Sequence, residues 1–298
     1  MNLVDSGPRT ISGTDTVIGP LGFGCWRMTE RNDNRGLIET ALDCGVNLID
    51  TADVYGYSAD GSGFGKAERV LGDLFAANPT LRDRVVLATK GGITPPVPYD
   101  SSPGYLRSAC EASLRRLRTD VIDIYMVHRP DMLTHPESVA ATLTELRDSG
   151  KVRHVGVSNY SVEQYRALTA HLDFPIAVTQ PEFSVAHLDP IRDGTFDTAM
   201  GDGVTPLAWS PLGGGDVMTA DAATDQLAAT LDHLAVREDV DRAAIALAFV
   251  LAHPSRPVAI VGTQRPERLR AALDAFGVSL DRNDCYDLIE ASDGVPLP

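Results

Sequence analysis

The sequence predicts an α/β protein of the (β/α)8 TIM-barrel class, in which eight parallel strands alternate with helices. The first observation is a series of eight short apolar segments, spaced roughly 25 to 50 residues apart along the chain. The second is that the segments between them carry apolar residues at helical spacing. Strand, helix and parallel strand repeated eight times within about 250 residues fit a closed barrel better than an open doubly wound sheet.

The strand candidates are short and apolar, which is typical of buried strands. No linker interrupts the repeat, so we expect one domain over residues 1–298. In chain order the candidates are residues 21–25, 46–49, 85–89, 122–127, 152–157, 176–179, 205–209 and 258–261.

Helices are expected between these strands, and a capping box of Ser161 and Gln164 indicates where one of them begins. Two pieces lie outside the repeat. Residues 9–18 are expected to form an N-terminal hairpin with a turn at Ser12 and Gly13, and a C-terminal extension follows Phe276. The residues with helical spacing are Leu37, Ile38, Ala41 and Leu42; Ala67, Val70, Leu71 and Leu74; Leu106, Cys110, Leu114 and Leu117; Val139, Leu143 and Leu146; Ile245, Ala248, Phe249 and Ala252; and Leu269, Ala272, Leu273 and Phe276.

Composition excludes several classes of function. The 41 acidic and 26 basic residues give a formal charge of -15, which opposes general binding to nucleic acid or to an anionic membrane. No apolar run approaches the roughly 18 residues that span a bilayer, and the N-terminus lacks a signal-peptide pattern, so a cytoplasmic protein is expected, most simply a monomer. The four cysteines form no CxxC pair and the seven histidines no HxxxH pair, so no metal site is expected.

Polar residues follow the apolar segments, and in a barrel the carboxyl ends of the strands meet at one rim where chemistry occurs. Asp50, Lys90 and His128 follow the second, third and fourth strand candidates, and Tyr55 lies in the loop after Asp50. Each alone has an ordinary structural explanation, as a turn cap, a packed ring or a hydrogen-bonded core group. Together a carboxylate, a phenol, an ammonium and an imidazole form a proton-transfer set, which predicts an active site.

Two loops late in the chain suit phosphate groups, which need clustered backbone N–H groups and fixed cations. The glycine-rich loop Leu212-Gly213-Gly214-Gly215 follows the seventh strand and suits a pyrophosphate. After the eighth strand, Gly262 leads into a helix with a proline in its first turn, which puts Thr263, Arg265 and Arg268 beside the positive end of the helix.

Six motifs occur in the order and spacing of a known family. They are LIDTADVYG, the Gly-x-x-Glu-x-x-Leu-Gly pattern at residues 65–72, VRHVGVSNYS, the strand end at Gln180, WSPLGGG and the segment 262–273. Over residues 21–276 the chain therefore resembles the aldo-keto reductases, and HRPD with GKVRHVGVSN resembles the bacterial soluble oxidoreductase branch.

The resemblance implies reduction of an aldehyde or ketone by hydride transfer from a nicotinamide cofactor. Tyr55 would donate the proton, and because a free phenol has a pKa of about 10, Lys90 would lower that pKa while Asp50 holds the ammonium in place. His128 would donate a hydrogen bond to the carbonyl oxygen. Trp26, Tyr57 and Pro130 would line the pocket of a small carbonyl substrate.

Cofactor contacts are implied in the same way. Ser158, Asn159 and Gln180 would hold the carboxamide and Trp209 would stack on the nicotinamide; Gly262 and the alanines at 271 and 272 depart from the family pattern, but Arg268 is retained. NADPH is therefore expected in preference to NADH. The full set of implied cofactor residues is Gly24, Cys25, Ser158, Asn159, Gln180, Trp209, Ser210, Leu212, Gly213, Gly262, Thr263, Arg265 and Arg268.

Two other functions stay open at this point. One is a cofactor-binding regulatory protein with little turnover, as the potassium-channel β subunits of the family illustrate. The other is an unrelated barrel hydrolase or lyase that uses paired carboxylates, with Asp50 and either Asp53 or Glu68 as the pair.

Overall fold

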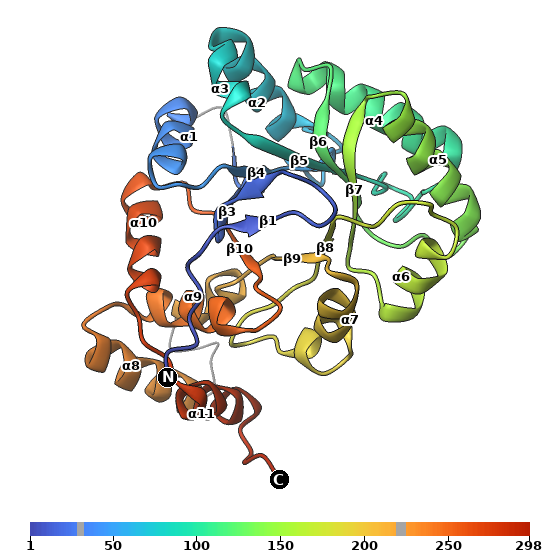
Figure 1. Cartoon of the computed structure of the whole chain (residues 1–298). Coiled ribbons are helices and arrows are strands. Elements are labelled where there is room, and N and C mark those ends of the chain that lie inside the picture. The colour runs from blue at the N-terminus through green and yellow to red at the C-terminus, as the bar shows by residue number, and fades with distance from the viewer. Residues whose placement is uncertain (29–32, 219–224) are drawn as a thin grey trace.

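Eight parallel strands form a closed barrel in the computed structural model, which describes residues 1–28, 33–218 and 225–298. The predicted (β/α)8 barrel is confirmed (Figure 1). Neighbouring strands around the barrel follow one another in the sequence, and the last strand closes on the first. The barrel strands are β3 (Leu21–Gly24), β4 (Leu48–Asp50), β5 (Val86–Gly91), β6 (Ile122–Val127), β7 (Val152–Ser158), β8 (Val178–Gln180), β9 (Thr205–Ala208) and β10 (Val258–Val261).

All eight strand candidates are strands, but several bounds differ from the prediction. Asp50, Lys90, Ser158 and Gln180 belong to the strands themselves rather than to the loops after them. The reason is strand pairing, because Asp50 pairs with Ala88 of β5 and Ser158 pairs with Gln180. These polar side chains are therefore held by the barrel and not by flexible connections.

Helices surround the barrel, and several begin where the sequence provides a cap. The predicted capping box of Ser161 and Gln164 is confirmed, and α3, α7 and α8 are additional to the helices that the sequence patterns indicated. Residues 219–224, which separate η2 from α8 in the sequence, lie outside the described part. The helices are α1 (Asn34–Asp43), α2 (Lys66–Ala77), α3 (Pro79–Asp83), α4 (Pro103–Leu117), α5 (Pro136–Asp148), α6 (Val162–Thr169), α7 (Thr195–Asp202), α8 (Asp225–Glu238), α9 (Arg242–Ala252), α10 (Pro266–Ala271) and α11 (Arg282–Asp293), with 3-10 segments η1 (Asp189–Ile191), η2 (Gly213–Met218) and η3 (Ala272–Phe276).

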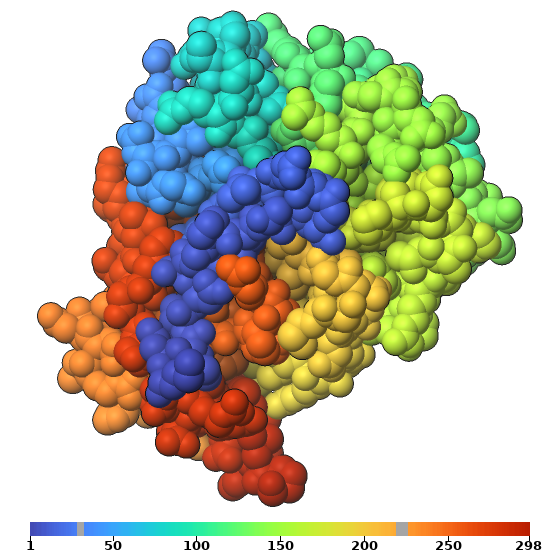
Figure 2. Space-filling model, in the orientation of Figure 1, coloured from blue at the N-terminus to red at the C-terminus, as the bar shows by residue number. Residues whose placement is uncertain are grey.

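The predicted N-terminal hairpin is confirmed as β1 (Arg9–Thr10) and β2 (Val17–Ile18), paired antiparallel. Figure 2 shows the N-terminal segment lying across one end of the barrel. Ile11 and Ile18 are fully buried there in a cluster that includes Leu48 and Val258, the first residues of β4 and β10. The hairpin thus covers the amino ends of the strands, and the carboxyl ends lie at the opposite end of the barrel.

The C-terminal extension is confirmed as α11, which packs against α8 (Figure 1). Its first turn is capped by Asp281, and Arg237 of α8 donates to both carboxylate oxygens of Asp284 at 2.6 and 2.9 Å. Among the helices that the structure describes, none is both long and apolar enough to cross a membrane.

Candidate active site

A buried ion pair lies at the centre of the rim formed by the carboxyl ends of the strands. Lys90 Nζ donates to Asp50 Oδ1 at 2.8 Å, to Asp50 Oδ2 at 2.7 Å and to the Thr51 carbonyl oxygen at 2.9 Å. Burial alone would lower the pKa of Lys90, but the charge of Asp50 and these hydrogen bonds outweigh it, so the pKa is raised. The ammonium is therefore charged and fixed in direction.

Tyr55 lies directly beside this pair. Lys90 Nζ is 5.0 Å from the centroid of the Tyr55 ring, so the phenol is close to the amine as the sequence predicted. Burial raises the pKa of Tyr55 to about 12, while the charge of Lys90 acts in the opposite direction. The expected lowering of this pKa is thus outweighed by desolvation, and the phenol keeps its proton throughout the neutral range.

His128 completes the group, with its ring centroid 5.8 Å from that of Tyr55. The imidazole is buried, and burial, followed by the charges of Lys90 and Arg129, lowers its pKa well below the usual value. Its Nδ1 has no hydrogen-bond partner among the described residues. His128 is therefore a neutral ring that has one N–H to donate.

A hydrogen-bond network joins four further predicted residues to this centre. Gln180 Nε2 donates to Asp50 Oδ1 at 3.0 Å, and Ser158 Oγ donates to the Gln180 carbonyl oxygen at 3.0 Å. Asn159 Nδ2 donates to the His128 carbonyl oxygen at 3.2 Å, and Trp209 Nε1 donates to Asn159 Oδ1 at 3.1 Å. The direct bond from Gln180 to Asp50 spans 130 positions of sequence and had no signal in any motif.

The two loops predicted to bind phosphate follow the neighbouring strands β9 and β10. Gly213, Gly214 and Gly215 all have positive φ, and a Cβ on either of the last two would meet no atom of the described residues within 4 Å, so their backbone is not covered by any of those residues. Arg265 precedes α10 at the N-cap position without a side-chain capping bond, and Arg268 lies within this helix of 6 residues; both side chains are exposed and neither has an ion pair among the described residues.

On the barrel side of these loops, Gly24 pairs with Asp50, and the Cys25 amide donates to the Asp50 carbonyl oxygen at 2.8 Å. Burial raises the pKa of the Cys25 thiol, so this group is held as an unreactive thiol.

The other predicted cofactor residues lie in the loops after β9 and β10. Ser210 has a positive φ of 48° and its carbonyl oxygen accepts from the Gly213 amide at 2.8 Å, and Leu212 packs on the core. Thr263 Oγ1 accepts from the Arg265 amide at 3.2 Å, while Gly262 lies beside Gly24.

The predicted substrate-pocket residues are placed differently from one another. Trp26 is 63% exposed and meets the Tyr55 ring edge-on, with the centroids 5.0 Å apart. Tyr57 packs instead on Phe64 within the loop after β4, and Pro130 is half-buried two residues beyond His128. A contact that the sequence did not indicate joins the loops over the rim, since Arg27 donates to the Gly214 carbonyl oxygen at 3.0 Å.

Behind the rim lie two buried acids, Asp53 and Glu68, which the sequence offered as partners for a hydrolase. Glu68 accepts from Thr89 Oγ1 and from Arg116 Nε, both at 2.6 Å. Asp53 Oδ1 has no partner among the described residues, and burial, followed by the charge of Glu68, raises the Asp53 pKa well above its usual value. Asp50 is engaged by Lys90 and Gln180, so neither of the two carboxylate pairs offered by the sequence is free at the rim, and the hydrolase interpretation loses its support.

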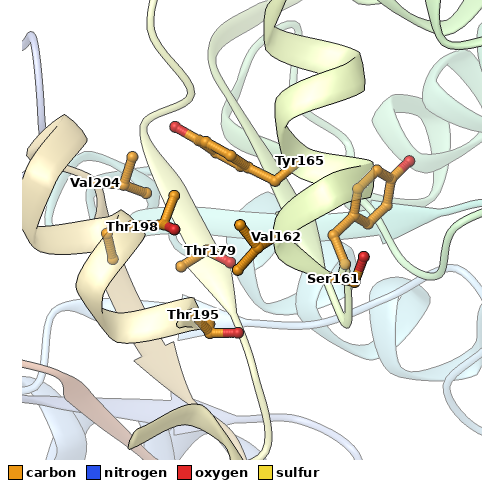
Figure 3. A pocket seen from close by; sticks show the side chains of 9 residues that line it. Ser161, Val162, Tyr165, Thr179, Thr195, Thr198 and Val204 are labelled. Atoms are coloured by element: carbon orange, nitrogen blue, oxygen red, sulfur yellow. The ribbon is translucent and has the colours of Figure 1, made fainter. Parts of the chain in front are cut away.

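The pocket between α6 and α7 and the side chains that could bind a metal are further candidates for a site of chemistry. The pocket between α6 and α7 (Figure 3), lined by Ser161, Tyr165 and several threonines, encloses about 10 Å³, room for no more than one water molecule. Within the described ranges, no group of three or more His, Cys, Asp or Glu side chains is arranged to hold a metal ion.

Comparison with known proteins agrees with this arrangement. The model of the aldo/keto reductase family matches residues 20–293. A 6-dehydroglucose reductase of Novosphingobium aromaticivorans is 44% identical over 97% of each chain, and a 6-dehydroglucose reductase of Agrobacterium fabrum is 34% identical over 89% of this chain and 91% of its own.

Solved structures show the same similarity. The glycerol dehydrogenase AKR11B4 from Gluconobacter oxydans has a TM-score of 0.84 at 27% identity and covers 98% of both chains. The thermostable aldo-keto reductase Tm1743 has a TM-score of 0.83 at 27% identity, covering 96% of this chain and 99% of its own.

Proposed function

Because the chain belongs to the aldo/keto reductase family, we propose that it uses NADPH to reduce an aldehyde to the alcohol, with Tyr55 as the proton donor. Membership of the family makes the protein an oxidoreductase that acts on a carbonyl group with a nicotinamide cofactor. The observation that carries the finer proposal is the contact of the Tyr55 ring with the buried Lys90 and Asp50 pair.

The donor set of the rim fits a nicotinamide dinucleotide. Glycine backbone at Gly213 to Gly215 is open, Arg265 and Arg268 are exposed cations at the start of α10, and the carbonyl and amide groups of Ser158, Asn159 and Gln180 lie together. When bound, the cofactor would supply the hydride that the carbonyl carbon receives.

Tyr55 would deliver the proton to the carbonyl oxygen. Its phenol is protonated at neutral pH, because its pKa is raised to about 12. As the proton leaves, the fixed charge of Lys90 stabilises the phenolate, and Asp50 keeps that charge in position. His128, held neutral, would donate one hydrogen bond to the same oxygen and so orient the substrate.

NADPH is the proposed cofactor because of Arg265, which immediately precedes α10, and Arg268, which lies within it. A 2'-phosphate carries two negative charges and pairs with guanidinium groups in a bidentate manner. Arg265 and Arg268 are exposed and have no ion pair within the described part of the chain, so both are available for such a group.

For the substrate we propose a polyhydroxylated aldehyde, with 6-dehydroglucose as the first candidate. Two relatives carry that substrate in their names, and one structural neighbour is named for glycerol. The exposed indole of Trp26 beside Tyr55 offers a flat apolar surface on which the C–H face of a sugar packs. Arg129, half-buried next to His128, adds donors for hydroxyl groups.

A spectrophotometric screen tests this proposal. NADPH oxidation is followed with 6-dehydroglucose, glyceraldehyde, small apolar aldehydes, ketones and dicarbonyls, and NADH is the comparison cofactor. We expect the highest kcat/KM with a hydroxylated aldehyde and NADPH. Binding of NADPH without turnover of any carbonyl would favour the regulatory alternative, and equal efficiency with NADH would contradict the cofactor proposal.

A further inference from the structure

A groove lined by arginines lies on the outside of the barrel, where α2 and α4 pack side by side. Its volume is about 460 Å³, and it is open to solvent along one side. Four arginines and only one acid line it, although the whole chain carries a formal charge of -15. The lining residues are Arg69, Asp73, Ala112, Arg115, Arg116 and Arg118.

Two glycines allow α2 to approach the end of α4 at this place. A Cβ on Gly72 would collide with the backbone of Arg116, and a Cβ on Gly65 would collide with the Arg116 side chain. Arg118, the C-cap residue of α4, adopts a left-handed conformation with φ of 51°. Its guanidinium lies 2.6 Å from the Asp73 carboxylate. The groove is therefore built from the close contact of two helices.

Two of the four arginines in the groove have no ion pair among the described residues, although the charge of Glu111 on α4 acts on Arg115. Arg116 is paired with the buried Glu68, and Arg118 is paired with the exposed Asp73. Arg69 donates to the Phe64 carbonyl oxygen at 2.7 Å, and neither Arg69 nor Arg115 forms an ion pair with any described residue. Cations in the last turn of α4 also stabilise the helix dipole, but Arg69 projects from the other helix and has no such explanation.

We propose that this groove binds a small anion with a multiply charged phosphate group, either inorganic or as a phosphate ester. Guanidinium forks match phosphate oxygens in a bidentate geometry, and Arg69 of α2 and Arg115 of α4 line the same groove. The site is separate from the rim residues proposed to hold the dinucleotide and does not depend on that proposal.

Calorimetric titration with inorganic pyrophosphate at constant ionic strength tests the site. The protein is first saturated with NADP⁺, so that the proposed dinucleotide loops are blocked. The double variant Arg69→Ala with Arg115→Ala leaves the Arg116 and Glu68 pair intact, and we expect it to weaken binding at least tenfold. The control variant Arg35→Ala with Arg107→Ala removes the same charge from exposed positions outside the groove and is expected to bind as the parent does.

Separate titrations with orthophosphate and with glucose 6-phosphate distinguish an inorganic ligand from an ester, and tighter binding of either one identifies the source. The proposal is overturned when pyrophosphate gives no saturable binding, or when the groove variant and its control bind equally. It is also overturned when Arg268→Ala, and not the groove variant, abolishes binding. A poly-glutamate peptide that binds more tightly than every phosphate would assign the groove to an acidic protein instead.

Discussion

Lys90 has the most constrained environment of the proposed catalytic residues. It is fully buried, and its ammonium donates to Asp50 and to the Thr51 carbonyl oxygen. A buried charge that loses its partner costs several kcal/mol, so the pair is kept together by the same burial that sets the properties of Tyr55. The position of the ammonium and the protonation of the phenol are therefore consequences of one desolvated site.

Replacement of Tyr55 by phenylalanine removes the proposed acid and leaves the ring. General acid catalysis contributes roughly 10²- to 10⁴-fold, so Tyr55→Phe is expected to lower kcat for carbonyl reduction by at least about 100-fold. NADPH affinity, measured by fluorescence titration, should change less than about threefold, because the phenol is not among the groups proposed to bind the cofactor.

The matched control is Tyr286→Phe, which removes a hydroxyl from the surface of α11 and should leave kcat unchanged. Full turnover by Tyr55→Phe would mean that another group supplies the proton.

Asp53 gives a prediction about stability and pH. Its pKa in the folded protein is raised by burial and by Glu68, so above its ordinary value of 3.8 the unfolded chain releases a proton that the folded chain retains. The contribution of Asp53 to the free energy of unfolding is therefore greatest below about pH 4 and falls as the pH rises. Asp53→Asn carries no such proton, so we expect it to be more stable than the parent at pH 7 and to lose this advantage as the pH falls to 4.

Urea unfolding at pH 4, 5.5 and 7 measures this difference, which should grow with pH. Asp43→Asn, at an exposed carboxylate near the end of α1, should show no such trend. A loss of stability in Asp53→Asn at pH 7 would show that the ionised carboxylate is the form that the fold stabilises.

At the scale of elements, the start of α10 is where the choice between cofactors is expected to lie. Arg268→Ala should weaken NADPH binding by roughly 10- to 100-fold, because a charge-assisted hydrogen bond contributes about 1.5–3 kcal/mol. NADH lacks the 2'-phosphate, and its affinity should change less than about threefold. Fluorescence titrations with both cofactors measure the two effects.

Arg270→Ala is the matched control on the same helix, since Arg270 donates to Thr40 at 3.4 Å and lies outside the proposed phosphate site. Equal losses for both cofactors in Arg268→Ala would place the guanidinium elsewhere than at the 2'-phosphate.

The sequence predicted which segments form helices or strands better than it predicted the residues at which they begin and end. Local signals such as the Ser161 capping box and the proline that opens α10 are read from a few adjacent residues, and both predictions are confirmed. Strand ends are determined by pairing with neighbours, and for that reason Lys90 and Gln180 lie inside strands that the sequence appeared to end one residue earlier. α8 was not predicted, and the loop before it is only partly described.

At the scale of the whole molecule, the proposed active site lies at one end of the barrel and the hairpin that covers the core lies at the other. Ile11 of the hairpin is fully buried among the amino ends of the strands, at the end opposite the rim. Ile11→Ala should lower the free energy of unfolding by about 2–5 kcal/mol and change kcat less than twofold. Val17→Ala, at a half-exposed position of the same hairpin, should cost far less. A large loss of kcat in folded Ile11→Ala would show that the two ends are coupled.

The amino-acid sequence by itself determined the class of fold, the order of the strands and the four polar residues at their ends, because periodicity, caps and family motifs are properties of local sequence. Only the tertiary structure decided that Gln180 binds Asp50, that burial raises the Tyr55 pKa to about 12, and that Arg69 and Arg115 line one groove. Desolvation and charge pairing depend on atoms that surround a group in space, and closure of the barrel brings those atoms from distant parts of the chain.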